Sequence, residues 1–385
     1  MDHRTGLPVV GMVGAGQLAR MTHQAAIPLG QSLRILADSA EDGAALAAAD
    51  VVLGNYRSLD DLRSFARGCD VVTFDHEHVP NEHVRALVAD GVAVHPGPDA
   101  LHYAQDKQAM RERLTALGIP CPRWAPIADA ASLAAFGAEV GWPVVLKATR
   151  GGYDGKGVWM ADELEDVQDV LASGTQLLAE ERVEIVRELA ATVARSPYGQ
   201  GAAWPVVHTV QQGGICVEVI APAPDLADGV AEQAQSLALR IAAELGVTGV
   251  LAVELFETPD GLLVNELAMR PHNSAHWTIE GSRTSQFEQH LRAVLDYPLG
   301  TTERRAPVIV MANLLAGPDD IVPKGIDERV HHFMGRWPDV KLHLYGKQFR
   351  PGRKVGHVTA LGDDLHMVRH RAQAAAAYLM NGDAE

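Results

Sequence analysis

The chain has 385 residues, enough for about two or three domains of roughly 150 residues each and for a large core without disulfide or metal cross-links. Its 33 Lys and Arg residues against 49 Asp and Glu residues give a formal net charge of −16. A surface this acidic repels nucleic acids and anionic membranes, which excludes a general polyanion-binding protein. An anionic small substrate would therefore need a locally basic pocket.

The three cysteines, Cys69, Cys121 and Cys216, are far apart and form no CxxC or Cys/His metal-binding spacing. Such a set favours a reducing compartment over a disulfide framework. The sequence has no apolar stretch of the ~18 residues that a membrane-spanning helix needs, and no signal-peptide pattern. We therefore expect a cytoplasmic protein.

Short apolar runs alternate with helical stretches over the first hundred residues. This alternation predicts a parallel sheet with helices on both faces. We expect helices at Gln17–Pro28 and Leu59–Arg67, and strands at Val9–Val13, Leu33–Ala37, Val51–Leu53, Val71–Phe74 and Val92–Val94.

A boundary follows the predicted helix at Asp106–Leu117, because Gly118, Pro120 and Pro122 come directly after it. The remaining chain shows no internal repeat. It predicts strands at Val144–Ala148 and Val158–Met160, a hairpin near residues 250–268, a linker at Thr301–Pro307 and a terminal helix over Ala372–Glu385.

The segment VVGMVGAGQLA at residues 9–19 follows a strand–glycine turn–helix pattern, and Asp38 ends the next strand. Such a turn lets a phosphate approach a helix N-terminus, which indicates a nucleotide site and, in its sharpest form, an NAD site. The alternative is a glycine turn that serves helix–strand packing. No hydride-transfer site follows downstream.

A second glycine-rich segment, GGYDGKG at residues 151–157, follows the strand that carries Lys147. So many glycines contribute no side-chain burial, and a mobile loop over phosphates is their natural use, with Lys147 and Lys156 facing the anion. The spacing is not that of a Walker A loop. The alternative is a flexible surface hairpin.

The hairpin near residues 250–268 contains a Pro-Asp-Gly turn. We expect a three-residue loop at Pro259–Gly261, with Thr258 opposite Leu262. In that register Glu254 faces Glu266, with their Cβ atoms about 5 Å apart.

Two carboxylates so placed repel each other unless a cation lies between them, and Mg²⁺ bridged to substrate phosphates suits such a pair. The alternatives are a solvated strand face or one protonated carboxyl group. A loop of two or four residues would instead place Glu254 opposite Asn265.

Three polar clusters complete the candidate site. The segment after the hairpin carries Arg270, His272 and Asn273, which suits an anion and metal pocket with Arg270 as a fork for phosphate or carboxylate and Asn273 as an oxygen ligand. Lys347 and the run RPGRKVGH at residues 350–357 suit a phosphate cradle. The run FDHEHVP at residues 74–80 ends a strand, where substrate hydrogen bonding is favoured over a metal site. The alternatives are a polar capping loop for the first cluster and a solvated turn for the second.

Together these segments resemble the ATP-grasp superfamily and, within it, the 5-(carboxyamino)imidazole ribonucleotide synthetase family. The resemblance runs almost end to end. It is carried by Gly14–Leu18, Glu77–Val79, Gly151–Gly157, Asn265–Ala268, His272–Ser274 and Arg350–His357.

The resemblance implies an α/β and α+β architecture. We expect an N-terminal Rossmann-like parallel-sheet domain over residues 1–105 and an ATP-grasp region over residues 106–300. That region would comprise a small lid subdomain at about 120–183 and a larger metal-binding part at about 184–300. A small C-terminal domain would cover residues 301–385.

The implied activity is ATP- and bicarbonate-dependent carboxylation of aminoimidazole ribonucleotide, through carboxyphosphate, by a homodimer. The implied ATP contacts are Lys107, Lys147, Gly152, Tyr153, Asp154, Gly155, Lys156, Gly157, Val158, Glu180, Glu181, Arg182, Val183, Glu188, Gln211, Asn265 and Glu266. The implied Mg²⁺ ligands are Glu254, Glu266 and Asn273. The implied ribonucleotide contacts are Glu77, Tyr153, Asp154, Arg270, His272, Asn273, Lys347, Arg353 and Lys354, and the catalytic groups are Arg270, His272, Lys147 and Asp154.

The chain departs from the family pattern at three positions: Met269 stands for Pro, Ala275 for Gly, and Gln211 for a His beside the nucleotide. The alternatives are a related ATP-grasp ligase, such as a formate-using glycinamide ribonucleotide transformylase or a biotin carboxylase, an NAD-dependent oxidoreductase, and a non-catalytic ATP-binding subunit. The basic run at residues 350–357 argues against a related ATP-grasp ligase. Intact Lys147, Glu254 and Glu266 argue against a non-catalytic ATP-binding subunit.

Overall fold

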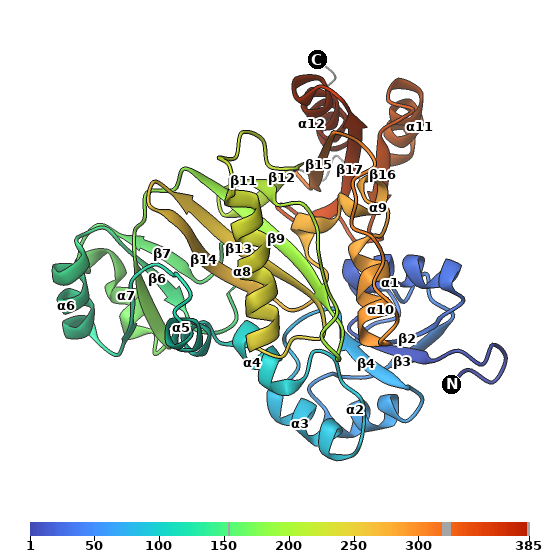
Figure 1. The fold of residues 1–385 in the computed structure, drawn as a ribbon, viewed down its shortest axis with the longest axis horizontal. Helices are drawn as coiled ribbons and strands as arrows, with labels where there is room; N and C mark the ends of the chain where they lie inside the picture. Colours follow the sequence, from blue (N-terminus) through green and yellow to red (C-terminus); the bar gives the residue numbers. More distant parts are fainter. Residues whose placement is uncertain (153–154, 318–324, 383–385) are drawn as a thin grey trace.

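The computed structural model describes residues 1–152, 155–317 and 325–382, and the structural statements below refer to these residues. In the N-terminal part, four parallel strands lie in the order β3-β2-β1-β4. They are β1 (Val9–Val13), β2 (Ser32–Ala37), β3 (Asp50–Leu53) and β4 (Val71–Phe74). The predicted parallel sheet is confirmed, and it lies at the lower right of Figure 1.

Helices cover both faces of this sheet because its strands are continuous apolar runs whose side chains point to both faces. Val10 and Met12 of β1 belong to one buried cluster with α1 and α10, whereas Val13 belongs to another with α2 and α3. The helices are α1 (Gln17–Ala26, continued by the short η1 at Ile27–Leu29), α2 (Leu59–Ala66), α3 (Asn81–Ala89), α4 (Pro98–Gln105) and α10 (Gln286–Val294).

The predicted strand at Val92–Val94 is wrong. Only Val94 forms a bridge, with Val72, and the proline at position 96 has no N–H with which to continue the ladder.

A separate four-stranded sheet in the order β5-β8-β6-β7 forms the left end of the molecule in Figure 1. Between it and the N-terminal sheet, α5 (Lys107–Ala116) is capped by Asp106, close to the predicted helix. The small sheet and its helices are β5 (Trp124–Ile127), α6 (Ala130–Val140), β6 (Val144–Ala148), β7 (Val158–Ala161), η2 (Leu164–Val167), α7 (Gln168–Ala172) and β8 (Leu177–Glu181).

The largest sheet has nine strands in the order β14-β13-β9-β11-β12-β15-β17-β16, with β10 paired to β9. Strands β15 to β17 come from the C-terminal part of the chain, and β15 joins the sheet by pairing antiparallel with β12. The C-terminal part therefore extends the central sheet. The strands are β9 (Arg187–Arg195), β10 (Gly201–Ala203), β11 (Val207–Gln212), β12 (Ile215–Ala221), β13 (Gly249–Thr258), β14 (Gly261–Ala268), β15 (Val308–Leu315), β16 (Lys341–Leu344) and β17 (Lys354–Gly362).

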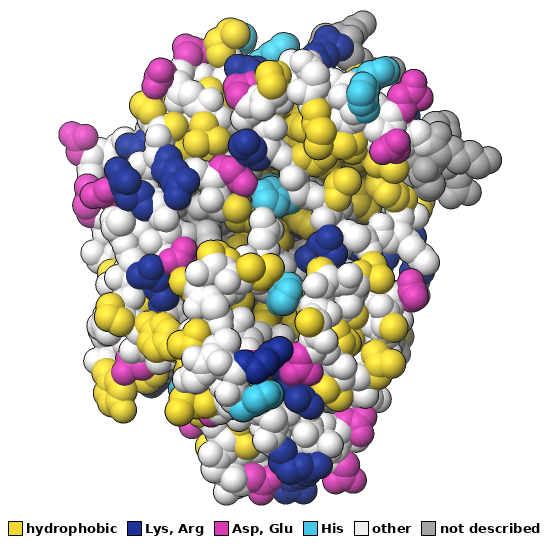
Figure 2. All heavy atoms as spheres, turned by 90° about the vertical axis from the view of Figure 1, so that its right-hand side faces the viewer, with side chains coloured by type: hydrophobic (Ala, Val, Ile, Leu, Met, Phe, Trp, Pro, Cys, Tyr) yellow, Lys and Arg dark blue, Asp and Glu magenta, His cyan; other side chains and the backbone are white. Residues whose placement is uncertain are grey.

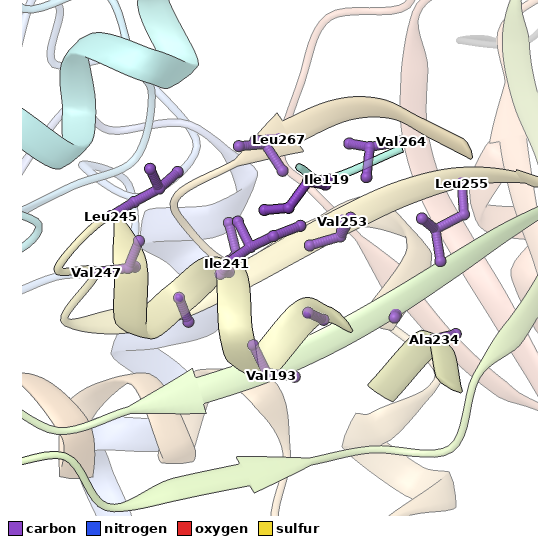
Figure 3. Close-up of a cluster of buried hydrophobic side chains, with 14 of the residues drawn as sticks. Ile119, Val193, Ala234, Ile241, Leu245, Val247, Val253, Leu255, Val264 and Leu267 are labelled. Carbon is purple, nitrogen blue, oxygen red and sulfur yellow. The ribbon is translucent and has the colours of Figure 1, made fainter. Parts of the chain in front are cut away.

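The main core forms where α8 (Val230–Glu244) packs on this sheet. Ala234, Ala238 and Ile241 recur at helical spacing on the buried face of α8. Figure 3 shows Ile241 against Val253 and near Val193 of the strands beneath it.

The remaining helices pack on strands of the large sheet or against neighbouring helices. They are η3 (Asn273–Ala275), α9 (Thr278–Gly281), α11 (Ile326–Arg336) and α12 (Leu365–Asn381). The C-terminal helix begins earlier than the predicted Ala372, because the side chain of Asp364 accepts the Met367 N–H and caps it there. Residues 383–385 of the predicted helix lie outside the described residues.

Among the residues with assigned positions, none of the helices combines the length and the apolar character that crossing a membrane requires. The face in Figure 2 carries its Lys and Arg side chains in several separate groups, with acidic side chains between them. This distribution agrees with the expectation of local basic pockets rather than a continuous basic surface.

Candidate active site

A cavity of about 1970 Å³ is lined by residues from all three predicted parts of the chain. Many of the predicted site residues meet there. Those that line it are Glu77, Lys107, Lys147, Gly152, Gly155, Val158, Glu180, Glu181, Arg182, Val183, Glu188, Gln211, Glu254, Asn265, Glu266, Arg270, His272, Asn273 and Lys354.

A few predicted site residues are not brought into this lining. Lys156, Gly157, Lys347 and Arg353 have described positions outside it. Tyr153 and Asp154 lie outside the described residues, so their predicted contacts stay predictions.

The β13–β14 hairpin places two carboxylates face to face. Its turn is one residue shorter than predicted, since Thr258 pairs with Gly261, so the predicted three-residue loop is wrong. An irregularity then shifts the register between Glu254 and Leu255, which makes Asn265 the extra residue of a bulge. The shift restores the predicted pairing of Glu254 with Glu266.

The charges of this pair are unequally balanced. Glu266 forms an ion pair with Lys107. Burial, followed by the charge of Glu266, raises the pKa of Glu254 to about 7. The Nε2 atom of His272 lies 3.6 Å from Glu254 Oε1, and burial lowers the pKa of His272 to about 3, so this imidazole is neutral. The Glu254–Glu266 pair therefore carries negative charge that a bound cation would balance.

The donor set suits a hard divalent cation in part. Within the described ranges, no group of three or more His, Cys, Asp or Glu side chains is placed to hold a metal ion. Mg²⁺ commonly uses one or two carboxylates and completes its shell with water and substrate phosphates. Glu254 and Glu266 therefore fit Mg²⁺ bound together with a nucleotide.

Asn273 is engaged elsewhere. Its Nδ2 donates to Asn313 Oδ1 at 2.9 Å, and Asn313 Nδ2 donates back to Asn273 Oδ1 at 2.8 Å. The amide beside Glu254 is that of Asn265, whose Nδ2 lies 3.4 Å from Glu254 Oε2. To act as the predicted metal ligand, Asn273 would have to share its oxygen with Asn313.

Lys147 is held by a buried ion-pair network. Its Nζ lies 2.7 Å from Glu180 Oε2 and donates to Asn265 Oδ1 at 3.0 Å. Glu180 Oε1 accepts from Arg111 Nε at 2.7 Å. Although burial opposes ionisation, Lys147 and Arg111 lower the pKa of Glu180 to about 2.

Two features of this network differ from the sequence analysis. The side chain of Glu180 points into the ion-pair network, and Glu181 Oε2 pairs with Arg123 Nε at 2.7 Å, so neither carboxylate is aimed only at a nucleotide. Arg111 was missed, although its position one helical turn after Lys107 on α5 was a usable signal.

The described residues of the glycine-rich loop border one side of the cavity, where Gly151, Gly152 and Gly155 line it. Ala148 N donates to Gly157 O at 2.8 Å, and Gly155 lies against the turn at Gly213 and Gly214, its missing Cβ position being 3.3 Å from Gly213 O. The loop thus rests on the β11–β12 turn and leaves no space there for a side chain.

Exposed apolar side chains mark a slot between the two sheets. Val158, Met160 and Ile185 are 41%, 52% and 44% exposed and line the cavity. A flat aromatic base would cover this apolar surface. Met160 and Ile185 were missed by the sequence analysis, because single apolar residues in a strand or loop carry no pattern.

Glu77 joins the N-terminal part to the segment after β14. Its Oε1 accepts the Met269 N–H at 2.7 Å, and its Oε2 lies 3.3 Å from Arg270 Nε. Gln286 in turn accepts the His272 N–H at 2.7 Å. The polar segment at residues 269–272 is therefore fixed from both sides.

The C-terminal basic run reaches the first glycine turn. Lys347 Nζ donates to Gln17 Oε1, and Arg353 Nη1 donates to Gln348 O at 3.4 Å. Lys354 lines the cavity. Lys347 of the C-terminal part thus lies beside the start of α1, which is far away in the sequence.

The first glycine turn is occupied by the chain itself. Asp75 accepts the Gly16 N–H at 2.5 Å and the Ala19 N–H at 2.9 Å, so it caps the N-terminus of α1. A Cβ atom at Gly16 would lie 2.5 Å from Asp75 Oδ2. These contacts support the packing interpretation of the turn and leave no reason to assign NAD binding.

The fold and the site define a protein of the ATP-grasp class. An ATP-grasp domain matches residues 112–287, a ribonucleotide synthetase preATP-grasp domain matches residues 7–105, and a phosphoribosylaminoimidazole carboxylase C-terminal domain matches residues 309–371. The chain belongs to the N5-carboxyaminoimidazole ribonucleotide synthase family.

Similar proteins cover almost the whole chain. The N5-carboxyaminoimidazole ribonucleotide synthase of Mycobacterium tuberculosis is 60% identical over 380 residues, 97% of this chain and 88% of that protein. The Corynebacterium ammoniagenes protein of the same name is 50% identical and covers 98% of this chain and 94% of its own length.

Two solved structures are similar in both fold and sequence. The Thermus thermophilus N5-carboxyaminoimidazole ribonucleotide synthetase superposes with a TM-score of 0.86 at 35% identity, covering 97% of this chain and 99% of that one. The Aspergillus clavatus enzyme, in complex with ADP and 5-aminoimidazole ribonucleotide, gives a TM-score of 0.87 at 31% identity, covering 97% and 98%.

These matches confirm the predicted family and the ATP-grasp architecture. The chain is an ATP-dependent, ADP-forming carbon–nitrogen ligase with ATP as co-substrate. The match of the C-terminal domain argues against the other ATP-grasp ligases considered from the sequence.

Proposed function

We propose that this chain catalyses the ATP- and bicarbonate-dependent carboxylation of 5-aminoimidazole ribonucleotide to N5-carboxyaminoimidazole ribonucleotide in purine biosynthesis. One observation carries the proposal: a single cavity joins the Lys107–Lys147 side, the facing Glu254 and Glu266, and the segment around Arg270. The names of the family's members, which cover almost the entire chain, support it.

The first chemical step is phosphoryl transfer: a bicarbonate oxygen attacks the γ-phosphorus of ATP, the bond between that phosphorus and the β,γ-bridging oxygen breaks, and carboxyphosphate forms with ADP as the leaving group. Such a transfer depends on positioning and on offsetting negative charge more than on covalent chemistry by the protein. Lys107, Lys147 and Arg270 supply positive charge at the cavity wall. Backbone N–H groups of the loop around Gly152 and Gly155 would bind the phosphate oxygens.

The nucleotide would lie between the two sheets. Val158, Met160 and Ile185 offer apolar surface for the adenine ring. The segment at residues 180–183 would border the base, with Glu188 at the ribose and Gln211 beside it.

Mg²⁺ is part of the proposal. Glu254 and Glu266 would hold it, with Asn265 orienting Glu254, and Asn273 is retained as a predicted further ligand. When bound, the ion would neutralise phosphate charge. Burial, followed by the charge of Glu266, raises the pKa of Glu254, and a bound cation would favour its ionised form.

The ribonucleotide would bind at the other end of the cavity. Glu77, Arg270 and His272 line the cavity and are proposed to contact its base and exocyclic amine, and the basic residues Lys347, Arg353 and Lys354 are proposed for its 5′-phosphate. Neutral His272 can donate or accept a hydrogen bond without adding charge. Tyr153 and Asp154 remain proposed contacts of the same substrate.

Exclusion of water completes the mechanism. Carboxyphosphate, or CO₂ released from it, would be hydrolysed or lost in an open site before the amine could capture it. Gly155, which lies against the turn at Gly213 and Gly214, would help to exclude water on that side.

We further propose the domain limits 1–105, 106–300 and 301–385, a homodimer, and a cytoplasmic location. The three matched segments, 7–105, 112–287 and 309–371, support the limits, and the three free cysteines support a reducing compartment. Light scattering coupled to gel filtration tests the dimer.

Phosphate release tests the function directly. The assay contains ATP, Mg²⁺, bicarbonate and 5-aminoimidazole ribonucleotide, and each substrate is omitted in turn. We expect rapid phosphate release only with the complete mixture. Equal release without the ribonucleotide, or none with the full set, would contradict the proposed function and favour a different ligase or a non-catalytic subunit.

A further inference from the structure

Arg111 is a fully buried arginine that belongs to none of the predicted site motifs. It lies on α5 with 1% of its surface exposed. Its Nε donates to Glu180 Oε1 and its Nη2 to the main-chain oxygen of Asn265, both at 2.7 Å. Burying a guanidinium is costly unless it is well paired, so these contacts define where its side chain must sit.

The hydrogen bond from Arg111 to the Asn265 carbonyl group fixes the bulge in β14. Strand β13 pairs with β9 in one unbroken register from Gly249 to Glu257, so the extra residue must be accommodated in β14. That residue is Asn265, and a bulge residue interrupts the ladder. Arg111 supplies a donor to its carbonyl group and thereby holds the bulge that sets Glu254 opposite Glu266.

The ion pair of Arg111 with Glu180 balances the charge of the carboxylate that also holds Lys147. Glu180 gives one carboxylate oxygen to Arg111 and the other to Lys147. Without Arg111, Lys147 would be the one cation among the described residues that is paired with this buried carboxylate. Its ammonium group would then be drawn toward Glu180 and away from a bound phosphate.

We propose that Arg111 is a positioning residue for nucleotide and metal binding, which fixes both the Asn265 bulge and the Lys147–Glu180 pair from one guanidinium group. It touches neither substrate nor metal in this role. The inference rests on the proposed function only in its use of a nucleotide with Mg²⁺.

Nucleotide binding to three variants tests this role. Calorimetric titration with ADP is run with Mg²⁺ and again with EDTA, on the wild type, Arg111→Met, Arg111→Lys and the control Arg113→Met. Arg113 lies on the same helix, is 38% exposed at its side chain, and its Nη2 donates to the Glu244 main-chain oxygen at 3.3 Å, with the Glu244 carboxylate 3.9 Å away. It therefore controls for the loss of an arginine from α5.

We expect Arg111→Met to weaken binding of ADP with Mg²⁺ by about 10- to 100-fold, the usual effect of losing a group that orients metal ligands. Arg111→Lys should fall between this variant and the wild type, because one ammonium group cannot serve Glu180 and the Asn265 carbonyl in the same fork geometry. Arg113→Met should bind as the wild type does.

A purely structural role predicts a different pattern. Melting temperature would fall in Arg111→Met, while folded Arg111→Met and Arg111→Lys would bind the nucleotide within twofold of the wild type, and this result overturns the proposal. If Arg111→Met does not fold, Arg111→Lys decides alone. The titration needs no ribonucleotide or bicarbonate, so failure of the proposed carboxylation is recognised separately, in the phosphate assay of the wild type.

Discussion

Glu254 lies directly opposite Glu266 across the β13–β14 ladder, although the turn between the two strands is one residue too short to put it there. The bulge at Asn265 makes up the difference. A hairpin without the bulge would pair Glu254 with Asn265 and turn Glu266 to the other face of the sheet. The local irregularity, and not the turn, therefore creates the paired carboxylates.

Replacing Glu266 with Gln should abolish the ATP turnover that depends on the ribonucleotide while the chain stays folded. The change removes one of two charges facing the phosphates, and we expect a rate loss of about 100-fold or more. Phosphate release and circular dichroism check both parts. Glu244→Gln, at an exposed position, serves as the control. Near-normal turnover in Glu266→Gln would contradict the assignment of Glu266 as a metal ligand.

Binding of Mg²⁺ should weaken as the pH falls below about 7. The pKa of Glu254 is raised to about 7, so below that pH the carboxyl group is protonated and the ion must displace a proton. Affinity should then fall about tenfold per pH unit. Titration of Mg²⁺ between pH 6 and pH 8 measures the slope. A flat profile in the wild type would contradict the prediction, and Glu254→Gln should be flat.

Replacing Asp75 with Ala should lower the free energy of unfolding by about 1–2 kcal/mol, because α1 loses the acceptor for its first N–H groups. Chemical denaturation measures the change. Asp364→Ala removes the side chain that caps α12, where Asp364 Oδ1 accepts the Met367 N–H at 2.8 Å. This change should lower the free energy of unfolding by a similar amount. Unchanged stability of Asp75→Ala would show that the carboxylate does not cap α1.

Replacing Asn313 with Ala should raise the KM for the ribonucleotide by severalfold, since Asn313 holds Asn273 through two reciprocal hydrogen bonds. We expect Asn273→Ala to raise this KM as well and, because Asn273 is the proposed further Mg²⁺ ligand, to weaken Mg²⁺ binding, with unchanged binding of ADP in EDTA. Steady-state kinetics measure the KM for the ribonucleotide, and calorimetry measures the binding of ADP and Mg²⁺. Unchanged Mg²⁺ binding in Asn273→Ala would contradict the proposal of Asn273 as a metal ligand.

Much of the site was predictable because its parts are local in sequence. The glycine-rich loop after Lys147, the hairpin around Glu254 and Glu266, and the polar segment at residues 270–273 each have a pattern within a few residues. The register of the hairpin was predicted for the wrong reason, because turn chemistry reports only on the turn. The bulge depends on the pairing of β13 with β9, because that unbroken register leaves β14 to accommodate the extra residue. Strand β9 lies far away in the chain.

The sequence by itself determined the family, the parallel N-terminal sheet and the cavity-lining segments, since strand periodicity, glycine turns and short polar motifs are written locally. Only the tertiary structure decided that Arg111 pairs with Glu180, 69 positions away, that Asp75 fills the first glycine turn, 59 positions from Gly16, and that the C-terminal strands extend the central sheet. The reason is physical: a buried charge must find its partner wherever packing brings one within hydrogen-bond distance, and sequence spacing does not encode that distance.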